Sequence, residues 1–177
     1  LPSHNGAARV LAIAAGRNLV AKPGRDSYEV FVEALATQTR AWGWEGAVLG
    51  CAAGLDPNSR LAASWINQLM LRIHDEDPWL LSVLGTPEKS IQIRGKAPRE
   101  AVVQHTLYPS GLMDMAGFLA GKTGTIQGTH GSLTILETEA DGVIRCTTVL
   151  RSTPKERRYK DLDTIRRRAR TRPTDRF

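Results

Sequence analysis

One short stretch of the chain, Gly121-Lys122-Thr123-Gly124-Thr125, combines a cation, two hydroxyl groups and two glycines. Groups of this kind bind anions, because the lysine and the hydroxyls donate hydrogen bonds and glycine lets a ligand approach the backbone. Two kinds of anion site fit the stretch. One is a phosphate loop of the form G-x-x-x-x-G-K-[ST], from which residues 116–123 differ by one glycine. The other is an edge strand that binds a carboxylate.

The residues after Lys122 distinguish the two sites. A phosphate loop requires a helix that begins at the Lys-Thr pair, since the first amides of that helix hold the phosphate. Residues 123–131 contain three glycines together with several threonines and Ile126. This composition disfavours a helix and suits a strand that leads into a loop. Also, no later apolar strand ends in an aspartate that could hold magnesium, so the sequence favours the edge strand.

Alternation along this strand places Lys122 and Gly124 on one face and Thr123 and Thr125 on the other. Without a Cβ, Gly124 would let a substrate backbone lie close to the strand edge. The backbone N–H of Thr125 could then point at a developing oxyanion. The stretch therefore has the groups for binding a peptide carboxylate and stabilising an acyl-transfer reaction.

A second motif, Ser3-His4-Asn5, stands at the head of the first predicted helix, where a serine alone would act as an N-cap. The chain has a single S-x-x-K tetrad, the pattern of an activated serine, at residues 152–155. It follows the predicted strands and precedes a helix, so we interpret Ser152 as a helix start and not as a nucleophile.

The elements that must position these motifs change character near residue 90. The first part, residues 1–90, is predicted to be mainly helical, and residues 91–170 to form antiparallel strands and a C-terminal helix. Helices are expected from Ser3 to Gly16, from Asp26 to Arg40, from Pro78 to Gly85 and from Pro154 to Arg170. The second of these begins at a capping box formed by Asp26 and Glu29. A further helix is expected after a Ser59 cap, with an apolar stripe of Leu61, Trp65, Leu69 and Ile73. Strands are expected at 90–94, 101–104, 118–126, 132–138 and 143–151.

Composition supports a single folded domain over residues 1–177, because 41% of the residues are hydrophobic. No stretch approaches the ~18 apolar residues of a membrane-spanning helix. Cys51 and Cys146 lack metal-site spacing, which leaves a disulfide open. The histidines are scattered as well, at positions 4, 74, 105 and 130, so no metal or cofactor is expected.

The net charge of +6 is concentrated in residues 151–176, and residues 171–177 form a basic tail. A solvated helix face is the simpler interpretation of this charge. The alternative is a basic module that binds the cell wall or nucleic acid through Arg166 to Arg170.

Taken in order, several segments resemble the low-molecular-mass penicillin-binding D-alanyl-D-alanine carboxypeptidases. The resemblance covers nearly the whole chain, although residues 44–51 depart from the family's Asn-Thr-x-Phe motif. The matching segments are Ser3 to Ala8 (S-x-N-x-A-A), Phe31 to Leu35 followed by Trp42-Gly43, Gly54 to Ser59 (a Gly-Leu-Asp turn), Lys122 to Thr125 (K-T-G-T), Asp141-Gly142 and Arg158 to Asp161.

The resemblance implies an α/β (α+β) fold of the β-lactamase/transpeptidase type and a serine hydrolase that forms an acyl-serine intermediate. It implies that Ser3 relays a proton to the leaving amine and that Asn5 bonds to the acyl side chain and the base lysine. Lys122 would add positive potential, and the Thr123 and Thr125 hydroxyls would bind the terminal carboxylate. The family's substrate is a peptidoglycan peptide ending in D-Ala-D-Ala, and β-lactams inhibit it. The expected location is extracytoplasmic, in the periplasm or cell envelope, and nucleic acid is not an expected partner.

The family's S-x-x-K nucleophile lies well before S-x-N, and this chain has no counterpart there. We therefore expect the N-terminal strands and the nucleophile helix to belong to a separate N-terminal segment. Alone, the chain is expected neither to hydrolyse D-Ala-D-Ala nor to become acylated by penicillin. A catalytically inactive relative is the other possibility.

Overall fold

The computed structural model describes residues 5–19, 24–95, 97–126 and 130–171. The chain divides into two compact units, one of residues 4–65 and the other beginning at Ile66. That these units form one domain, with a change of character near residue 90, stays a prediction. Within the described ranges, no helix combines the length and the apolar composition needed to cross a bilayer.

In the first unit, helix α1 (Asn5–Leu19) packs against helix α2 (Ser27–Ala41). The predicted cap of α2 is confirmed, because the Asp26 carboxylate accepts hydrogen bonds from the amides of Tyr28 and Glu29. The prediction that Gly16 ends α1 was wrong. A Cβ on Gly16 would lie 1.7 Å from the carbonyl oxygen of Ser27, so this glycine lets the two helices meet closely.

The loop after α2 folds around Trp44, which is buried. Its ring centroid lies 4.9 Å from that of Trp42 and 6.0 Å from that of Trp65. The expected cap by Ser59 is also wrong: its hydroxyl accepts a hydrogen bond from the Gly50 amide at 3.3 Å, and helix α3 begins four residues later.

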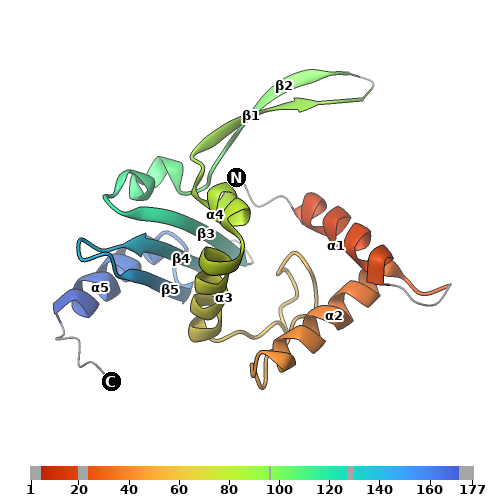
Figure 1. Cartoon of the computed structure of the whole chain (residues 1–177), viewed down its shortest axis with the longest axis horizontal. Helices are drawn as coiled ribbons and strands as arrows, with labels where there is room; N and C mark the ends of the chain where they lie inside the picture. The colour runs from red at the N-terminus through yellow and green to blue at the C-terminus, as the bar shows by residue number, and fades with distance from the viewer. Residues whose placement is uncertain (1–4, 20–23, 96, 127–129, 172–177) are drawn as a thin grey trace. The chain divides into compact units, whose positions relative to one another are not determined.

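The second unit is built on the antiparallel sheet β3-β4-β5, whose strands are β3 (Phe118–Ile126), β4 (His130–Thr138) and β5 (Ile144–Ser152). The three predicted strands are confirmed. Helices α3 (Ala63–Glu76) and α4 (Pro78–Gly85) contribute to an apolar cluster on one face of the sheet, and α5 (Arg157–Thr171) contributes to a cluster on the other (Figure 1). The cluster beside α3 and α4 centres on Met70, Ala120 and Leu136, and that beside α5 on Leu107, Leu133, Ile135, Val149 and Leu162.

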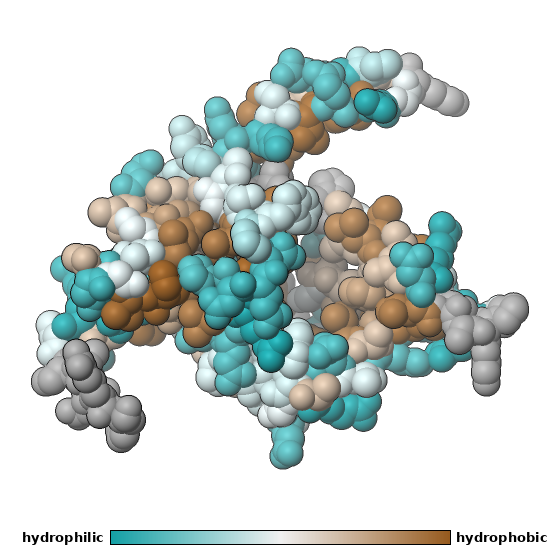
Figure 2. Space-filling view, in the orientation of Figure 1, coloured by the Kyte–Doolittle hydropathy of each residue, from teal (hydrophilic) through white to brown (hydrophobic). Residues whose placement is uncertain are grey.

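A separate two-stranded ribbon lies between α4 and the sheet in the sequence. It pairs β1 (Glu88–Ile93) with β2 (Arg99–Gln104) and extends away from the sheet (Figure 1). Both strands were predicted, but their pairing into a sheet of their own was not. Most ribbon residues are exposed, and Figure 2 shows hydrophilic and hydrophobic surface side by side along it.

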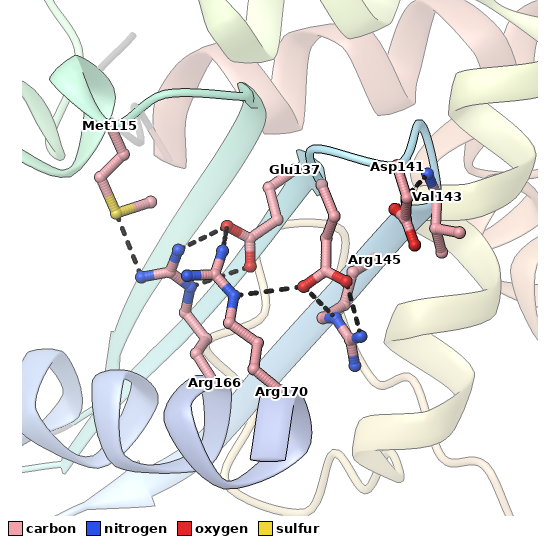
Figure 3. A network of polar contacts seen from close by, with 8 residues as sticks. Met115, Glu137, Asp141, Val143, Arg145, Arg166 and Arg170 are labelled. Atoms are coloured by element: carbon pink, nitrogen blue, oxygen red, sulfur yellow. Dashed lines mark hydrogen bonds and ion pairs between the residues drawn. The ribbon is translucent and has the colours of Figure 1, made fainter. Parts of the chain in front are cut away.

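Helix α5 is joined to β4 by a network of ion pairs (Figure 3). Arg166, 6% exposed, donates through Nε to Glu137 at 2.9 Å and also contacts the second oxygen of this fully buried carboxylate. Arg170 bonds to Glu137 at 3.1 Å and to Glu139 at 3.1 Å, and Glu139 pairs with Arg145. The interpretation of this charge run as a purely solvated face was therefore wrong for Arg166, whose charge is used inside the protein. Residues 172–177 of the predicted basic tail lie outside the described residues.

The start of α5 also differs from the sequence prediction. The helix begins at Arg157 instead of Pro154, and Ser152 is the last residue of β5 instead of a helix start. Cys51 and Cys146 are both free thiols.

Candidate functional site

The K-T-G residues lie in the middle of β3, which is an edge strand: within the described residues it pairs with β4 alone. Lys122 and Gly124 are exposed and Thr123 is buried, as the predicted alternation requires, whereas Thr125, which the alternation places with Thr123, is exposed. No helix begins at Lys122, which rules out the phosphate-loop interpretation of this motif.

Lys122 stands at the end of a polar row that crosses the α3 side of the sheet. Its partner in register on β4 is Thr134, and the next in the row is Thr148 on β5. The two threonine hydroxyls lie 2.6 Å apart, and Thr148 donates to the Asn67 side chain of α3 at 2.6 Å. These bonds satisfy the buried hydroxyls and fix the sheet beneath the lysine.

The Lys122 ammonium donates to the carbonyl oxygen of Thr123. The pKa of Lys122 lies below its ordinary value, chiefly because its ammonium is partly desolvated and then because Arg158 carries a like charge nearby. Two cations held together in this way create a positive potential at the strand edge, which favours a carboxylate ligand.

Arg158 of α5 is a site residue that sequence reasoning did not identify as such. Its Nη1 donates to the Gly124 carbonyl and to the Thr125 hydroxyl, both at 3.1 Å, and Nη2 lies 3.2 Å from the Tyr159 hydroxyl. The Nε atom is buried and has no hydrogen-bond partner in the described part of the chain. The sequence shows only that an arginine lies in the first turn of the helix after the hairpin. Its hydrogen bonds to β3 depend on tertiary packing, which the sequence does not reveal.

Three glycines near the motif serve different purposes. A Cβ on Gly131 would lie 2.4 Å from the Lys155 carbonyl oxygen, so this glycine lets the approach to α5 pack against β4. A Cβ on Gly121 would lie 2.4 Å from the Leu107 side chain. At Gly124 the nearest atom would be the Ser132 Cβ, at an ordinary 3.8 Å. Internal packing thus does not require Gly124 to be glycine, in keeping with a ligand that approaches from outside.

A buried loop before the first short 3-10 helix, Tyr108–Ser110, holds β3 in place. The His105 ring accepts the Leu107 amide proton at Nδ1, so Nε2 carries the proton and donates to the Gly121 carbonyl at 3.0 Å. Burial lowers the pKa of His105, which favours the neutral ring.

Thr106, in the same loop, shares a hydrogen bond of 2.7 Å between its hydroxyl and that of Thr123. Thr123 is only 5% exposed. The expected role of its hydroxyl in carboxylate binding stays a prediction, and it requires the hydroxyl to form a further bond beside the one to Thr106.

The S-x-N motif is only partly described. Asn5 is the exposed first residue of α1 in the first unit, and Ser3 lies outside the described residues. The pairing of Ser3 and Asn5 with Lys122 therefore stays a prediction.

The S-x-x-K tetrad at residues 152–155 lies where the chain passes from β5 to α5. Ser152 is 6% exposed, and its hydroxyl donates to Asp161 at 2.7 Å. This hydrogen bond, followed by that from Arg157, lowers the pKa of Asp161, which makes the carboxylate a weak base. The Lys155 ammonium lies 3.9 Å from a Glu156 oxygen. The structure thus supports the interpretation that Ser152 is not the nucleophile.

Within the described ranges, no three side chains of the His, Cys, Asp or Glu type gather as a possible metal site. No protein-family model matches the chain, and no curated protein matches its sequence.

Solved structures do match. The Streptomyces K15 DD-transpeptidase superposes with a TM-score of 0.78 at 19% sequence identity, over 94% of this chain and 63% of that one. A penicillin-binding protein homologue from Mycobacterium tuberculosis superposes with a TM-score of 0.64 at 16% identity, over 97% of this chain and 62% of that one. The chain has the α+β fold of these proteins, as the sequence predicted, and it spans less than two thirds of their length.

Proposed function

We propose that this chain is part of a serine-type D-Ala-D-Ala carboxypeptidase of the penicillin-binding kind, acting on peptidoglycan stem peptides through an acyl-serine. One observation carries the proposal: in a DD-transpeptidase-like fold, Lys-Thr-Gly lies on an edge strand with Lys122 exposed and Arg158 bonded to Gly124 and Thr125. This arrangement offers a peptide both a strand edge and a positive potential for its terminal carboxylate.

In this proposal the terminal carboxylate binds near Lys122 and Arg158, and the peptide lies along β3 at Gly124. The Thr125 amide donates to the carbonyl oxygen as it becomes an oxyanion. Arg158 fixes the strand at this point because its guanidinium bonds to both residues. The strand therefore holds the carbonyl in place for attack without itself forming a covalent bond.

The covalent step is assigned to a serine of an S-x-x-K motif on a separate N-terminal segment. Its oxygen attacks the carbonyl carbon between the two D-alanines, and its proton passes through the lysine of that motif and Ser3 to the leaving amine. The peptide C–N bond breaks and D-alanine leaves. Water then hydrolyses the ester and restores the serine.

The sheet offers a place for such a segment. Strand β5 is the second edge strand of the described sheet, and it borders an open groove of about 460 Å³ with α5. Val149, Leu150 and Ile165 line this groove together with polar and charged residues, among them Arg157 and Asp161. N-terminal strands that pair with β5 would cover them. Since stem peptides are found outside the cytoplasmic membrane, we place the enzyme in the cell envelope.

A basic nucleic-acid module is less well supported. Arg166 and Arg170 pair with Glu137 and Glu139, and Arg167 pairs with Asp163, so much of the charge in this run is compensated within the protein. Weak, salt-insensitive retention on DNA would agree with this assignment.

The direct test of the proposed reaction is release of D-alanine from a peptide ending in D-Ala-D-Ala. The chain is co-produced with the proposed N-terminal segment that carries S-x-x-K, and the Lys122→Ala variant is compared with Lys155→Ala as a control of equal charge change. Lys122→Ala should lower kcat/KM about a hundredfold, since it removes a charge that stabilises the bound and reacting peptide, whereas Lys155→Ala should not. Equal rates in the two variants, or no reaction in the unmodified pair, would contradict the proposal and favour an inactive relative.

A further inference from the structure

The β1-β2 ribbon has two chemically different faces. In an antiparallel pair, alternate residues share a face with the residues directly opposite them. The register therefore gathers Ile91, Ile93, Ala101 and Val103 on one face. The other face carries the polar residues Ser90, Gln92 and Gln104 together with a single apolar residue, Val102.

Charge divides between the faces in the same way. Lys89 lies at one end of the apolar face and Arg99 at the other, and both are exposed. Glu88 and Glu100 lie on the polar face, where Gln104 donates to Glu88 at 3.4 Å. The apolar strip is thus bordered by cations, and the acids point to the opposite side.

The ribbon gains little support from the rest of the second unit. On the apolar face Ile91 is 40% exposed and Ile93, Ala101 and Val103 are half-buried, and the packing of β1 and β2 is mainly with each other. An isolated two-stranded hairpin is at best marginally stable in water, so a surface that covers the apolar strip would stabilise it.

We propose that the apolar face of this ribbon docks on an anionic phospholipid surface. The distribution of charge selects this occupant: an apolar strip can enter the acyl boundary, Lys89 and Arg99 meet the lipid phosphates, and Glu88 and Glu100 face water. The proposal is independent of the catalytic assignment, since it uses no residue of the K-T-G site.

Binding of the full chain to vesicles tests this surface. Co-flotation is measured with vesicles of phosphatidylcholine alone and of phosphatidylcholine mixed with phosphatidylglycerol. The chain should bind the mixed vesicles and not the neutral ones. Lys89→Gln and Arg99→Gln should each weaken binding about fivefold, the share expected for one basic side chain near an anionic surface. Ile91→Ser should weaken it roughly tenfold through lost apolar burial.

Two matched variants serve as controls. Val102→Ser removes an apolar side chain from the polar face, and Arg168→Gln removes an exposed charge from α5; both should bind like the unmodified chain. Since Lys89 and Arg99 are exposed, their variants should melt at the unmodified temperature, which keeps the test valid if Ile91→Ser disturbs the ribbon.

Equal binding to neutral vesicles, or equal losses in the ribbon and control variants, would overturn the proposal. So would an absence of lipid binding together with an Ile91-dependent dimer in sedimentation, which would assign the apolar face to a second copy of the chain. Failure to bind lipid with capture of an acidic protein by the same face would overturn it as well.

Discussion

Gly124 and Gly131 show how two glycines beside one site differ in purpose. At Gly131 an added Cβ would meet backbone at 2.4 Å, whereas at Gly124 it would find an ordinary contact at 3.8 Å. Packing of the protein explains the first glycine. We propose that the approach of a ligand to the edge of β3 explains the second.

The Gly124→Ala variant should therefore keep its stability and lose reaction with substrate. We expect its free energy of unfolding to change by less than about 0.5 kcal/mol and acylation of the co-produced pair by penicillin to slow at least about tenfold, because the methyl group displaces the ligand. Urea unfolding and labelling kinetics measure the two effects. Gly131→Ala provides the contrast, with a loss of about 1–3 kcal/mol from overpacking. Unimpaired acylation in Gly124→Ala would contradict the assignment of the strand edge.

His105 should make stability depend on pH. Burial lowers its pKa in the folded protein, so the unfolded chain binds the proton more readily. The stabilising effect of the neutral ring is complete above the ordinary histidine pKa of about 6.5 and declines as the pH falls below it toward the folded pKa. Urea midpoints of the unmodified chain and of His105→Gln, which keeps a donor for the Gly121 carbonyl, should diverge in pH dependence over this range. Parallel curves would show that His105 does not titrate as described.

At the scale of elements, α5 is held to β4 by a buried ion pair. Removal of one partner is expected to cost more stability than removal of both. Arg166→Met would leave the fully buried Glu137 with only the half-exposed Arg170. We expect a loss of about 3 kcal/mol in the free energy of unfolding, because breaking a buried pair leaves an incompletely compensated charge.

The double variant Glu137→Leu/Arg166→Met should recover part of that loss, since both charges are then gone. Arg167→Met, which removes an exposed pair with Asp163, should change stability by no more than about 0.5 kcal/mol. Urea unfolding of the set measures the coupling. Similar losses in Arg166→Met and Arg167→Met would contradict the structural role of the buried pair.

The elements themselves could be predicted because their signals are local. Alternation predicted β3, β4 and β5, and the Asp26 carboxylate that caps α2 is near its own amides. The errors arose where a distant partner decides the role of a residue. Gly16 meets Ser27 instead of ending a helix, and Ser152 bonds to Asp161 instead of starting one.

The same difference applies to the candidate site. Lys122, Thr123 and Gly124 were identified from their spacing within one strand. Arg158 was recognised only as part of a segment that resembles the family's closing helix, because its contact with Gly124 spans 34 residues and depends on how α5 packs. The ion pair of Arg166 with Glu137 could not be predicted for the same reason, since no local sequence pattern relates the two residues.

At the scale of the whole molecule, the sheet is open on both sides within the described residues, at β3 and at β5. We assign the β3 edge to the substrate and the β5 edge to the segment that carries the nucleophile. The chain spans 63% of the transpeptidase that it resembles in fold, which leaves room in such a protein for a segment of this kind.

Labelling with a fluorescent penicillin tests the central claim most directly. The chain is incubated with the reagent alone and together with the S-x-x-K segment, and the two polypeptides are separated under denaturing conditions before the label is located by mass. We predict that the chain alone stays unlabelled, that the segment becomes labelled only when the chain is present, and that Lys122→Ala abolishes most of the signal. Label bound covalently to this chain, at Ser152 or any other residue, would contradict the account.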